Sequence, residues 1–270
     1  MTPRRTPNRQ RTPWPLGAPA VLGALLLVVP LLGLLVRAPW SGLGRILGTA
    51  EVLDALWLSL FCATAAVLIS LALGVPLAWV LARSSMPGIR LLRALVTLPL
   101  VLPPVVGGVA LLLVLGRNGL VGQWLDEWFG ITIPFTTGAV VIAETFVAMP
   151  FLVIAVEGAF RSADQGYDEA AATLGASRLT VFRRVTLPLI RPALVAGSVL
   201  CWARALGEFG ATITFAGNLP GVTQTMPLAV YGAMETDPDA ALALSLVLLA
   251  VSVAVLFALR GRWIGQGGAT

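Results

Sequence analysis

The sequence contains no lysine and no histidine, and arginine supplies all 18 of its basic residues. A Walker A phosphate loop needs a lysine to reach the β- and γ-phosphates of ATP, so the chain is not a P-loop ATPase, and any chemistry of ATP and Mg²⁺ would belong to a partner. The same absences exclude histidine general bases, histidine metal sites and lysine Schiff bases. We therefore expect no catalytic residue, no metal site and no cofactor in this chain.

Charge is scarce as well: 11% of the 270 residues are charged, while 57% are hydrophobic. A soluble domain carries about 25% charged residues, so this composition indicates an integral membrane protein. The two cysteines, Cys62 and Cys201, lie alone in apolar stretches and are expected to be small buried side chains. The net charge of +5 does not indicate a nucleic-acid partner, because the arginines are dispersed at the ends of apolar segments instead of forming one basic face.

A membrane-spanning helix needs about 20 mostly apolar residues, and several stretches meet this requirement. They lie at about 16–36, 55–82, 94–116, 136–158, 193–215 and 240–259. The charge-free stretch 209–234 overlaps the fifth, but its glycines, prolines and hydroxyl residues favour an external loop or a re-entrant segment over a seventh span. The expected fold class is an all-α integral membrane protein with six transmembrane helices.

The arginines are distributed unequally between the two sides of the membrane. Alternate connections place 14 on one side: Arg4, Arg5, Arg9, Arg11, Arg83, Arg90, Arg93, Arg161, Arg178, Arg183, Arg184, Arg191, Arg260 and Arg262. The opposite side has three, Arg37, Arg45 and Arg117, and Arg204 lies within a span. Because positively charged loops stay in the cytoplasm, both termini and the 161–191 loop are expected there.

The 161–191 loop carries the local signals of two short helices joined by a turn. Ser162 and Gln165 have the spacing of a capping box, which predicts the start of the first helix. Gly175 suits a left-handed end of that helix. Ser177 suits the N-cap of the second helix, and Pro188 is expected to end it.

Ala171 and Gly175 lie four residues apart and would share a helix face that another chain could approach closely. On spacing alone, this face fits a docking surface and an ordinary connector under the spans equally well. The surrounding passage resembles the EAA loop of ABC importer permeases, in which Glu-Ala-Ala is followed at fixed spacings by Gly, Ile and Leu-Pro. The matching residues are Glu169, Ala170, Ala171, Gly175, Leu187 and Pro188, with Val185 in place of the isoleucine.

This resemblance extends over about residues 52–260 and implies the type-1 transmembrane domain of a binding-protein-dependent ABC importer. In that family the loop forms a coupling helix-turn-helix that sits in a cleft of a cytoplasmic ATP-binding subunit. The implied partners are a second copy of the chain, two ATPase subunits, an external binding protein and the lipid bilayer of a bacterial or archaeal cell membrane. Residues 1–51 would add an arginine- and proline-rich cytoplasmic tail and a first span, and residues 261–270 would form a second cytoplasmic tail.

A second passage, residues 203–231, points to a substrate class. It contains Gly207-Glu208-Phe209-Gly210 followed by Gly217-Asn218, and it resembles molybdate permeases and, more loosely, sulfate and tungstate permeases. The resemblance implies oxyanion import, with molybdate ahead of sulfate and tungstate. The alternative from a different class is an ion-coupled secondary anion carrier, which would show inverted repeats and midplane ionisable groups that this sequence hardly offers. A membrane enzyme is disfavoured by the missing histidine and lysine.

Several polar residues within or beside the spans are candidates for the translocation path. They are Arg204, Glu208, Thr212, Thr214, Asn218 and Glu144. Arg204 and Glu208 lie one helical turn apart in the expected outer half of their span, either as a structural ion pair or as path-lining charges. The threonines and the asparagine are neutral donors that would release an anion readily, although hydroxyls also bond backbone carbonyls in apolar helices. Glu144 would be either a buried structural hydrogen bonder or part of the path.

Overall fold

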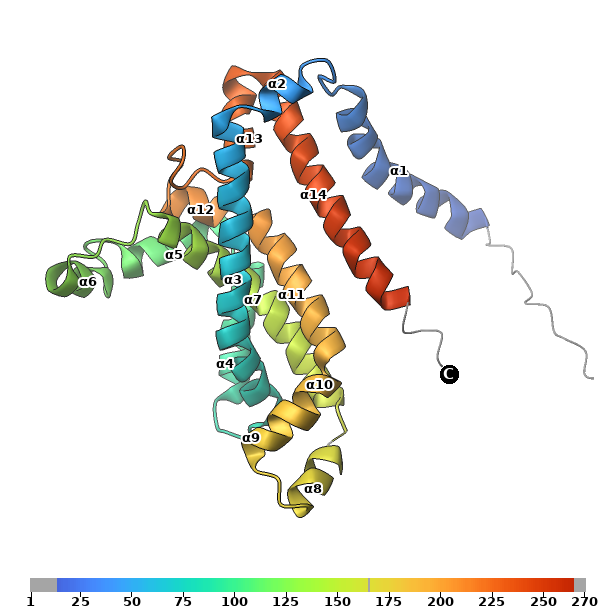
Figure 1. Cartoon of the computed structure of the whole chain (residues 1–270), viewed down its shortest axis with the longest axis vertical. Coiled ribbons are helices and arrows are strands. Elements are labelled where there is room, and N and C mark those ends of the chain that lie inside the picture. The colour runs from blue at the N-terminus through green and yellow to red at the C-terminus, as the bar shows by residue number, and fades with distance from the viewer. Residues whose placement is uncertain (1–13, 165, 265–270) are drawn as a thin grey trace, which may run out of the picture.

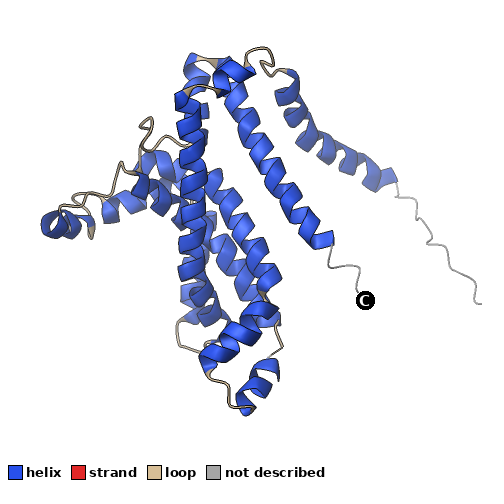
Figure 2. Ribbon diagram, in the orientation of Figure 1, coloured by secondary structure: helices blue, strands red, loops and turns tan. Residues whose placement is uncertain are grey.

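A computed structural model describes residues 14–164 and 166–264, and within these ranges all regular secondary structure is helical (Figure 2). The elements are α1 (Trp14–Val36), α2 (Leu43–Leu47), α3 (Ala50–Arg83), α4 (Ile89–Val101), α5 (Pro104–Leu115), α6 (Gly122–Phe129), α7 (Thr137–Ser162), α8 (Gly166–Thr173), α9 (Arg178–Val181), the wide π-type turn η1 (Phe182–Thr186), α10 (Leu187–Leu189), α11 (Arg191–Leu206), α12 (Gly210–Phe215), α13 (Met226–Thr236) and α14 (Pro238–Ile264). The predicted arginine-rich segment 1–13 and residues 265–270 of the predicted C-terminal tail lie outside the described residues.

The core of the fold is formed by α3, α7 and α11, which lie side by side (Figure 1). Helices in lipid gain little from the hydrophobic effect and associate through close packing, which small residues permit. Gly74 on α3 and Gly197 on α11 serve this purpose. A Cβ at Gly74 would lie 3.2 Å from a methyl group of Val153, and one at Gly197 would lie 3.0 Å from the Cβ of Ala155.

Four described helices are individually long and apolar enough to cross a membrane, namely α1, α3, α7 and α14. None of the best apolar window of α1 is buried within the chain, whereas 56% of the corresponding window of α7 is buried. α1 and α14 lie to one side of the core bundle (Figure 1). The first span is therefore an addition at the edge of the bundle rather than part of its core.

The predicted span at 94–116 is bent, because α4 and α5 meet at an angle of 118°, as in a broken span or a re-entrant segment. Pro103 and Pro104 explain the break. Proline has no N–H and forces the preceding residue out of the helical region, and Leu102 is accordingly extended, with ψ 130°. Pro104 then occupies the first turn of α5, where its missing N–H is harmless. α5 consequently turns sideways out of the bundle and packs against α12 (Figure 1).

The predicted span at 193–215 is also interrupted. α11 ends at Leu206, and α12 begins only at Gly210. Gly207 favours the interruption because glycine is a poor helix former. The Glu208 carboxylate then accepts the N–H of Ala211 at 2.8 Å, which satisfies a donor in the first turn of α12. The charge-free 209–234 stretch is thus partly helical, as α12 and α13 joined by a loop.

A short helix, α6, follows α5 and is held by a polar cluster at the loop that leads into it. Asp126 accepts hydrogen bonds from Arg117 Nε at 2.9 Å and from Thr132 Oγ1 at 3.0 Å. The hydrogen bond from Arg117, followed by that from Thr132, lowers the pKa of the Asp126 carboxyl below its usual value. Gly130, with φ 65°, ends the helix in the left-handed conformation.

Candidate functional site

The first half of the 161–191 loop is a helix closed by a glycine turn. Gly175 has φ 85°, a conformation that side-chain-bearing residues rarely adopt. Its N–H bonds the carbonyl of Ala172 at 3.0 Å, and the N–H of Ala176 bonds the carbonyl of Ala171 at 3.1 Å. This pair of bonds is the Schellman motif, so the predicted left-handed end at Gly175 is confirmed.

The predicted start of this helix at Ser162 is wrong. Ser162 is the last residue of α7, and its hydroxyl donates to the carbonyl of Ala159 at 3.1 Å. α8 begins at Gly166, whose N–H bonds Asp164 Oδ1 at 2.9 Å. The short carboxylate side chain of Asp164 reaches the backbone two residues on, as aspartate commonly does in turns, and so replaces the serine at the helix start. Gln165, the other member of the predicted capping box, lies outside the described residues.

The second half of the loop follows the prediction to within one residue. Ser177 caps it as expected, accepting the N–H of Thr180 at 3.3 Å. Pro188 lies one residue before its end, since α9, η1 and α10 continue to Leu189 and the chain turns by 72° before α11. The π-type turn precedes the proline, which has no N–H and crowds the carbonyl four residues earlier. A wider turn relieves that clash, so the helix continues through Pro188.

The residues of the EAA pattern lie on the outside of this helix pair. Glu169, Ala170 and Gly175 are exposed on α8 and its closing turn, while Ala171 is partly buried. Leu174 beside them is 88% exposed. On the second helix Pro188 is exposed and Leu187 packs against the core. The loop therefore offers a small-residue surface that nothing in the described chain covers.

Asp168 ties this loop to the bundle. Its Oδ1 accepts the hydroxyl of Thr186 on η1 at 2.9 Å, and its Oδ2 lies 3.6 Å from Nη2 of Arg83, the last residue of α3. The rings of Phe182 and Phe160 pack at 6.3 Å and hold the second helix of the loop against α7. The loop is therefore attached to the ends of both α3 and α7.

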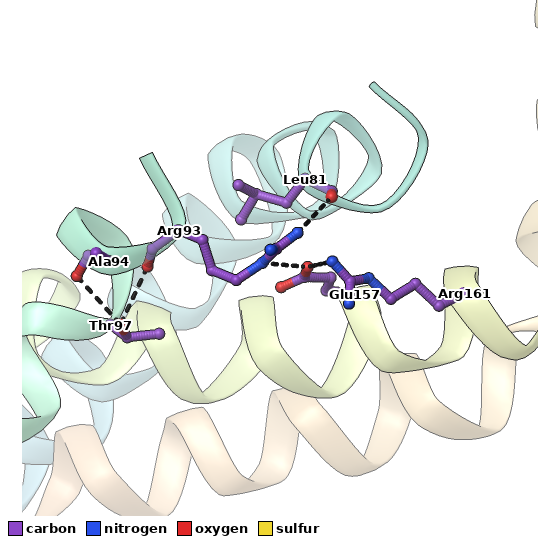
Figure 3. A network of polar contacts seen from close by, with 6 residues as sticks. All are labelled: Leu81, Arg93, Ala94, Thr97, Glu157 and Arg161. Carbon is purple, nitrogen blue, oxygen red and sulfur yellow. Dashed lines mark hydrogen bonds and ion pairs between the residues drawn. The ribbon is translucent and has the colours of Figure 1, made fainter. Parts of the chain in front are cut away.

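A second polar cluster joins the same ends of α3, α4 and α7 (Figure 3). Arg93 on α4 donates from Nε to Glu157 Oε1 at 2.9 Å and from Nη2 to the carbonyl of Leu81 at 3.0 Å. Glu157 on α7 also pairs with Arg161 at 2.8 Å. Leu81 lies in the last turn of α3, whose carbonyls have no partner within the helix, so Arg93 supplies a missing donor there.

The predicted pairing of Arg204 with Glu208 is confirmed, at 2.6 Å between Nη2 and Oε2. The pair lies at the break between α11 and α12. Glu208 is 1% exposed, so its charge is compensated mainly by Arg204 and by the N–H of Ala211. Trp202, one turn from this break, bonds Thr64 near the middle of α3. The pair therefore lies near the middle of the bundle's length.

The other candidate path residues differ in how they are satisfied. Thr214 donates to the carbonyl of Gly210 at 2.7 Å, as hydroxyls in apolar helices commonly do. Thr212 Oγ1, Asn218 Oδ1 and Glu144 Oε2 are buried and have no hydrogen-bond partner within the described part of the chain. Such unsatisfied buried atoms are uncommon. A role for these residues in passing an anion stays a prediction.

The sequence predictions missed Asp168, Arg83 and Arg93 as site residues. In the sequence, Asp168 is recognisable only as an acidic residue in the first turn of a helix, where it favours helix formation. That position does not indicate a contact with another helix. From the sequence, Arg93 and Arg83 indicate only on which side of the membrane their connections lie. Their partners lie 64 and 85 residues away in sequence, where no local rule connects them.

Comparison with known proteins identifies relatives over nearly the whole chain. The sequence profile of the family described as "Binding-protein-dependent transport system inner membrane component" matches residues 70–265. Molybdenum transport system permease protein ModB of Mycobacterium tuberculosis is 51% identical, covering 90% of this chain and 92% of that protein. ModB of Escherichia coli is 43% identical, with 79% and 93% covered. Sulfate transport system permease protein CysT of Escherichia coli is 36% identical, with 90% and 89% covered.

Solved structures share the fold. A bacterial ABC transporter involved in the import of alginate superposes with a TM-score of 0.73 at 19% identity, covering 95% of this chain and 96% of that one. The MetNI methionine ABC transporter superposes with a TM-score of 0.61 at 18% identity, covering 78% and 93%. With the family match spanning most of the sequence, the chain belongs to the inner membrane components of binding-protein-dependent transport systems, the permeases of ABC importers.

Proposed function

We propose that the chain is the membrane-spanning permease subunit of an ATP-driven importer that carries molybdate into the cytoplasm. The observation that carries this proposal is the ordering of its relatives. Two proteins named as molybdenum permeases are 51% and 43% identical to the chain, whereas a sulfate permease is 36% identical. Sulfate and tungstate remain the competing oxyanions.

The functional assembly in this proposal contains two copies of the chain, two cytoplasmic ATPase subunits and an external binding protein. The ATPases would bind ATP and Mg²⁺, since the chain has no lysine with which to build a Walker A loop. The exposed surface of Glu169, Ala170 and Gly175, with the partly buried Ala171 beside it, supports contact with an ATPase, and Leu187 and Pro188 lead from it into the bundle. A solved relative in fold is described as a complex with a periplasmic protein, which supports an external partner.

The chain would cross a bacterial or archaeal cell membrane with both termini and the 161–191 loop in the cytoplasm. The excess of arginine at that end supports this orientation. Residues 52–260 would form the permease core, with α1 as an added span. The substrate would pass near the break between α11 and α12, where Arg204, Glu208, Thr212, Thr214, Asn218 and Glu144 lie on or near the broken segment.

Reconstitution tests the proposal directly. The chain, its ATPase and its binding protein are assembled in lipid vesicles, and uptake of labelled molybdate is measured with ATP, without ATP and with a non-hydrolysable ATP analogue. Uptake only with hydrolysable ATP and binding protein is the expected result. Excess tungstate and sulfate are then added as competitors, and molybdate preference requires that sulfate compete weakly.

Two outcomes would contradict the proposal. Uptake driven by an ion gradient through the chain alone would support the secondary-carrier alternative. ATP-driven uptake of sulfate but not of molybdate would show that the chain belongs to an importer whose substrate is sulfate.

A further inference from the structure

The α8 helix makes few contacts with the rest of the chain. It packs mainly against α9 and η1, and most of its side chains are exposed. Tyr167 is 60% exposed and Leu174 is 88% exposed. A partner that pushes on α8 can therefore act on the bundle through the two chain ends of the helix, through its packing against α9 and η1, or through a side chain that points inward.

Asp168 is such an inward side chain. Its carboxylate contacts two elements at once, the end of α3 through Arg83 and η1 through Thr186. Thr186 is 3% exposed, the Arg83 side chain is 13% exposed and the Asp168 side chain is 29% exposed, so both contacts are partly shielded from water. Shielding strengthens an electrostatic contact relative to one on the surface. η1 continues through α10 to α11, so Asp168 connects α8 with two of the three core helices.

The contact with Arg83 is longer than a hydrogen bond. Charge-assisted N–H to carboxylate bonds measure about 2.7–2.9 Å, whereas Arg83 Nη2 lies 3.6 Å from Asp168 Oδ2. Nη2 is buried, and across residues 14–164 and 166–264 it has no hydrogen-bond acceptor. A buried guanidinium N–H without an acceptor is unfavourable, so a small approach of α8 toward α3 would be favoured by closing this bond.

The end of α3 is fixed to its neighbours, so a force applied there is passed on. Arg93 holds the carbonyl of Leu81 and the carboxylate of Glu157 together (Figure 3). Arg83 lies only two residues beyond Leu81. A pull on Arg83 therefore acts on α3, α4 and α7 together.

We propose that Asp168 is a positioning residue that transmits displacement of α8 to α3 through Arg83 and to α11 through Thr186, and that the Asp168–Arg83 pair closes in one state of the transport cycle. This inference rests on the proposed function, because the displacement comes from the ATPase partner. It concerns this chain's own contacts and not the docking surface itself.

The test measures ATP hydrolysis and molybdate uptake separately in the reconstituted complex. Asp168→Asn removes the charge but keeps an acceptor for Thr186. Energetic coupling between sites is typically altered by a few-fold to about 30-fold, and we expect Asp168→Asn to lower uptake per ATP hydrolysed by about fivefold. Arg83→Gln should do the same. The charge-reversed pair Arg83→Glu/Asp168→Arg should recover at least about half of the ratio, since it restores the attraction.

Matched variants separate coupling from general damage. Arg90→Gln removes an exposed arginine from α4 at the same end of the bundle and should leave the ratio unchanged. Thr186→Val tests the second contact, and Thr186→Ser, which keeps the hydroxyl, is its control. A lowered ratio in Thr186→Val but not in Thr186→Ser is expected.

The outcomes separate this inference from the proposed function. Absence of ATP-driven molybdate uptake in the unmodified complex would overturn the proposed function. Normal uptake in that complex with an unchanged ratio in Asp168→Asn would overturn the inference alone. If Asp168→Asn lowers uptake and hydrolysis equally and also lowers the melting temperature of the detergent-solubilised chain, the residue is only structural and the inference is again wrong.

Discussion

Gly175 determines where the two helices of the 161–191 loop meet. Its positive φ lets the chain turn through the Schellman motif, and no atom lies within 4 Å of the position where a Cβ would be. Space is therefore not the constraint at this residue. The constraint is the backbone conformation alone, which every L-residue with a side chain disfavours.

Replacing Gly175 with alanine should cost about 1–2 kcal/mol locally, because alanine is strained in the left-handed region. We expect the loop to open at this turn and ATP-driven uptake to fall several-fold, while the melting temperature of the whole chain changes little. Gly158→Ala is the matched control, since Gly158 is helical and also has no atom within 4 Å. Uptake in Gly175→Ala equal to that in Gly158→Ala would show that the turn is not required.

The pair of Arg204 and Glu208 can be examined by a double-mutant cycle. Arg204→Gln leaves the Glu208 carboxylate, 1% exposed, without its cation, and breaking a buried pair in this way costs about 3–5 kcal/mol. We expect the double variant Arg204→Gln/Glu208→Gln to be more stable than Arg204→Gln, as measured by thermal unfolding in detergent. If the stability losses of the single variants Arg204→Gln and Glu208→Gln simply add in the double variant, the two side chains do not interact and the pairing is contradicted.

Uptake by the same double variant distinguishes the two roles left open for this pair. If the pair only holds the broken helix end, restored stability brings restored uptake. If it lines the path, uptake stays low although the chain is stable.

The residues that were predicted correctly are those governed by local rules. Gly175, the Ser177 cap and the Arg204–Glu208 pair all depend on residues within four or five positions, where helix geometry fixes the contact. Asp168 with Arg83 and Arg93 with Glu157 depend on which helix ends lie together in space. A single sequence does not specify which helix ends are neighbours, so these contacts could be identified only from the structure.

At the scale of whole elements, hydropathy located the apolar segments but not their directions. The segment 94–116 is apolar enough to be one span, yet it contains the bend between α4 and α5. The signal was present as Pro103-Pro104, which is a weak predictor because prolines are tolerated within transmembrane helices. Pro76 and Pro150 lie inside α3 and α7, where those helices continue past them.

The packing of α5 on α12 depends on Gly108. A Cβ there would clash with Thr214 Oγ1 and would lie 2.7 Å from the carbonyl oxygen of Ala211. Overpacking of this kind costs about 1–3 kcal/mol, so Gly108→Ala should lower the melting temperature and loosen α5. Adding Thr214→Ala should recover part of the loss, because it removes one of the two clashes.

A suitable control for Gly108→Ala is Gly23→Ala on α1, where no atom lies within 4 Å. Hydrogen exchange of the α5 and α12 amides provides a second measurement. Equal melting temperatures for the two alanine variants would show that α5 and α12 are not packed as described.

At the scale of the whole molecule, the orientation in the membrane can be tested with introduced cysteines. Both native cysteines are fully buried, so the unmodified chain should react little with a membrane-impermeant maleimide. Glu235 on α13 and Leu174 directly after α8 are exposed, and these two helices lie at opposite ends of the bundle (Figure 1). In cells that express the chain without an ATPase, Glu235→Cys should be labelled from outside, and Leu174→Cys only after the membrane is permeabilised.

The reverse pattern would invert the proposed topology, and with it the side from which an ATPase could act. Labelling of both variants in intact cells would indicate that the population inserts in two orientations. The unmodified chain, treated in parallel, measures the background from Cys62 and Cys201.

The sideways course of α5 has a consequence for biosynthesis. The ribosome completes α5 about 100 residues before it completes α12, the helix that holds α5 in place through Gly108. A 12-residue helix is about 18 Å long, too short to cross a hydrocarbon layer of about 30 Å on its own. The nascent chain therefore lacks the packing of α5 on α12 until the later segment has been synthesised. We expect this contact, which joins segments far apart in the sequence, to form late.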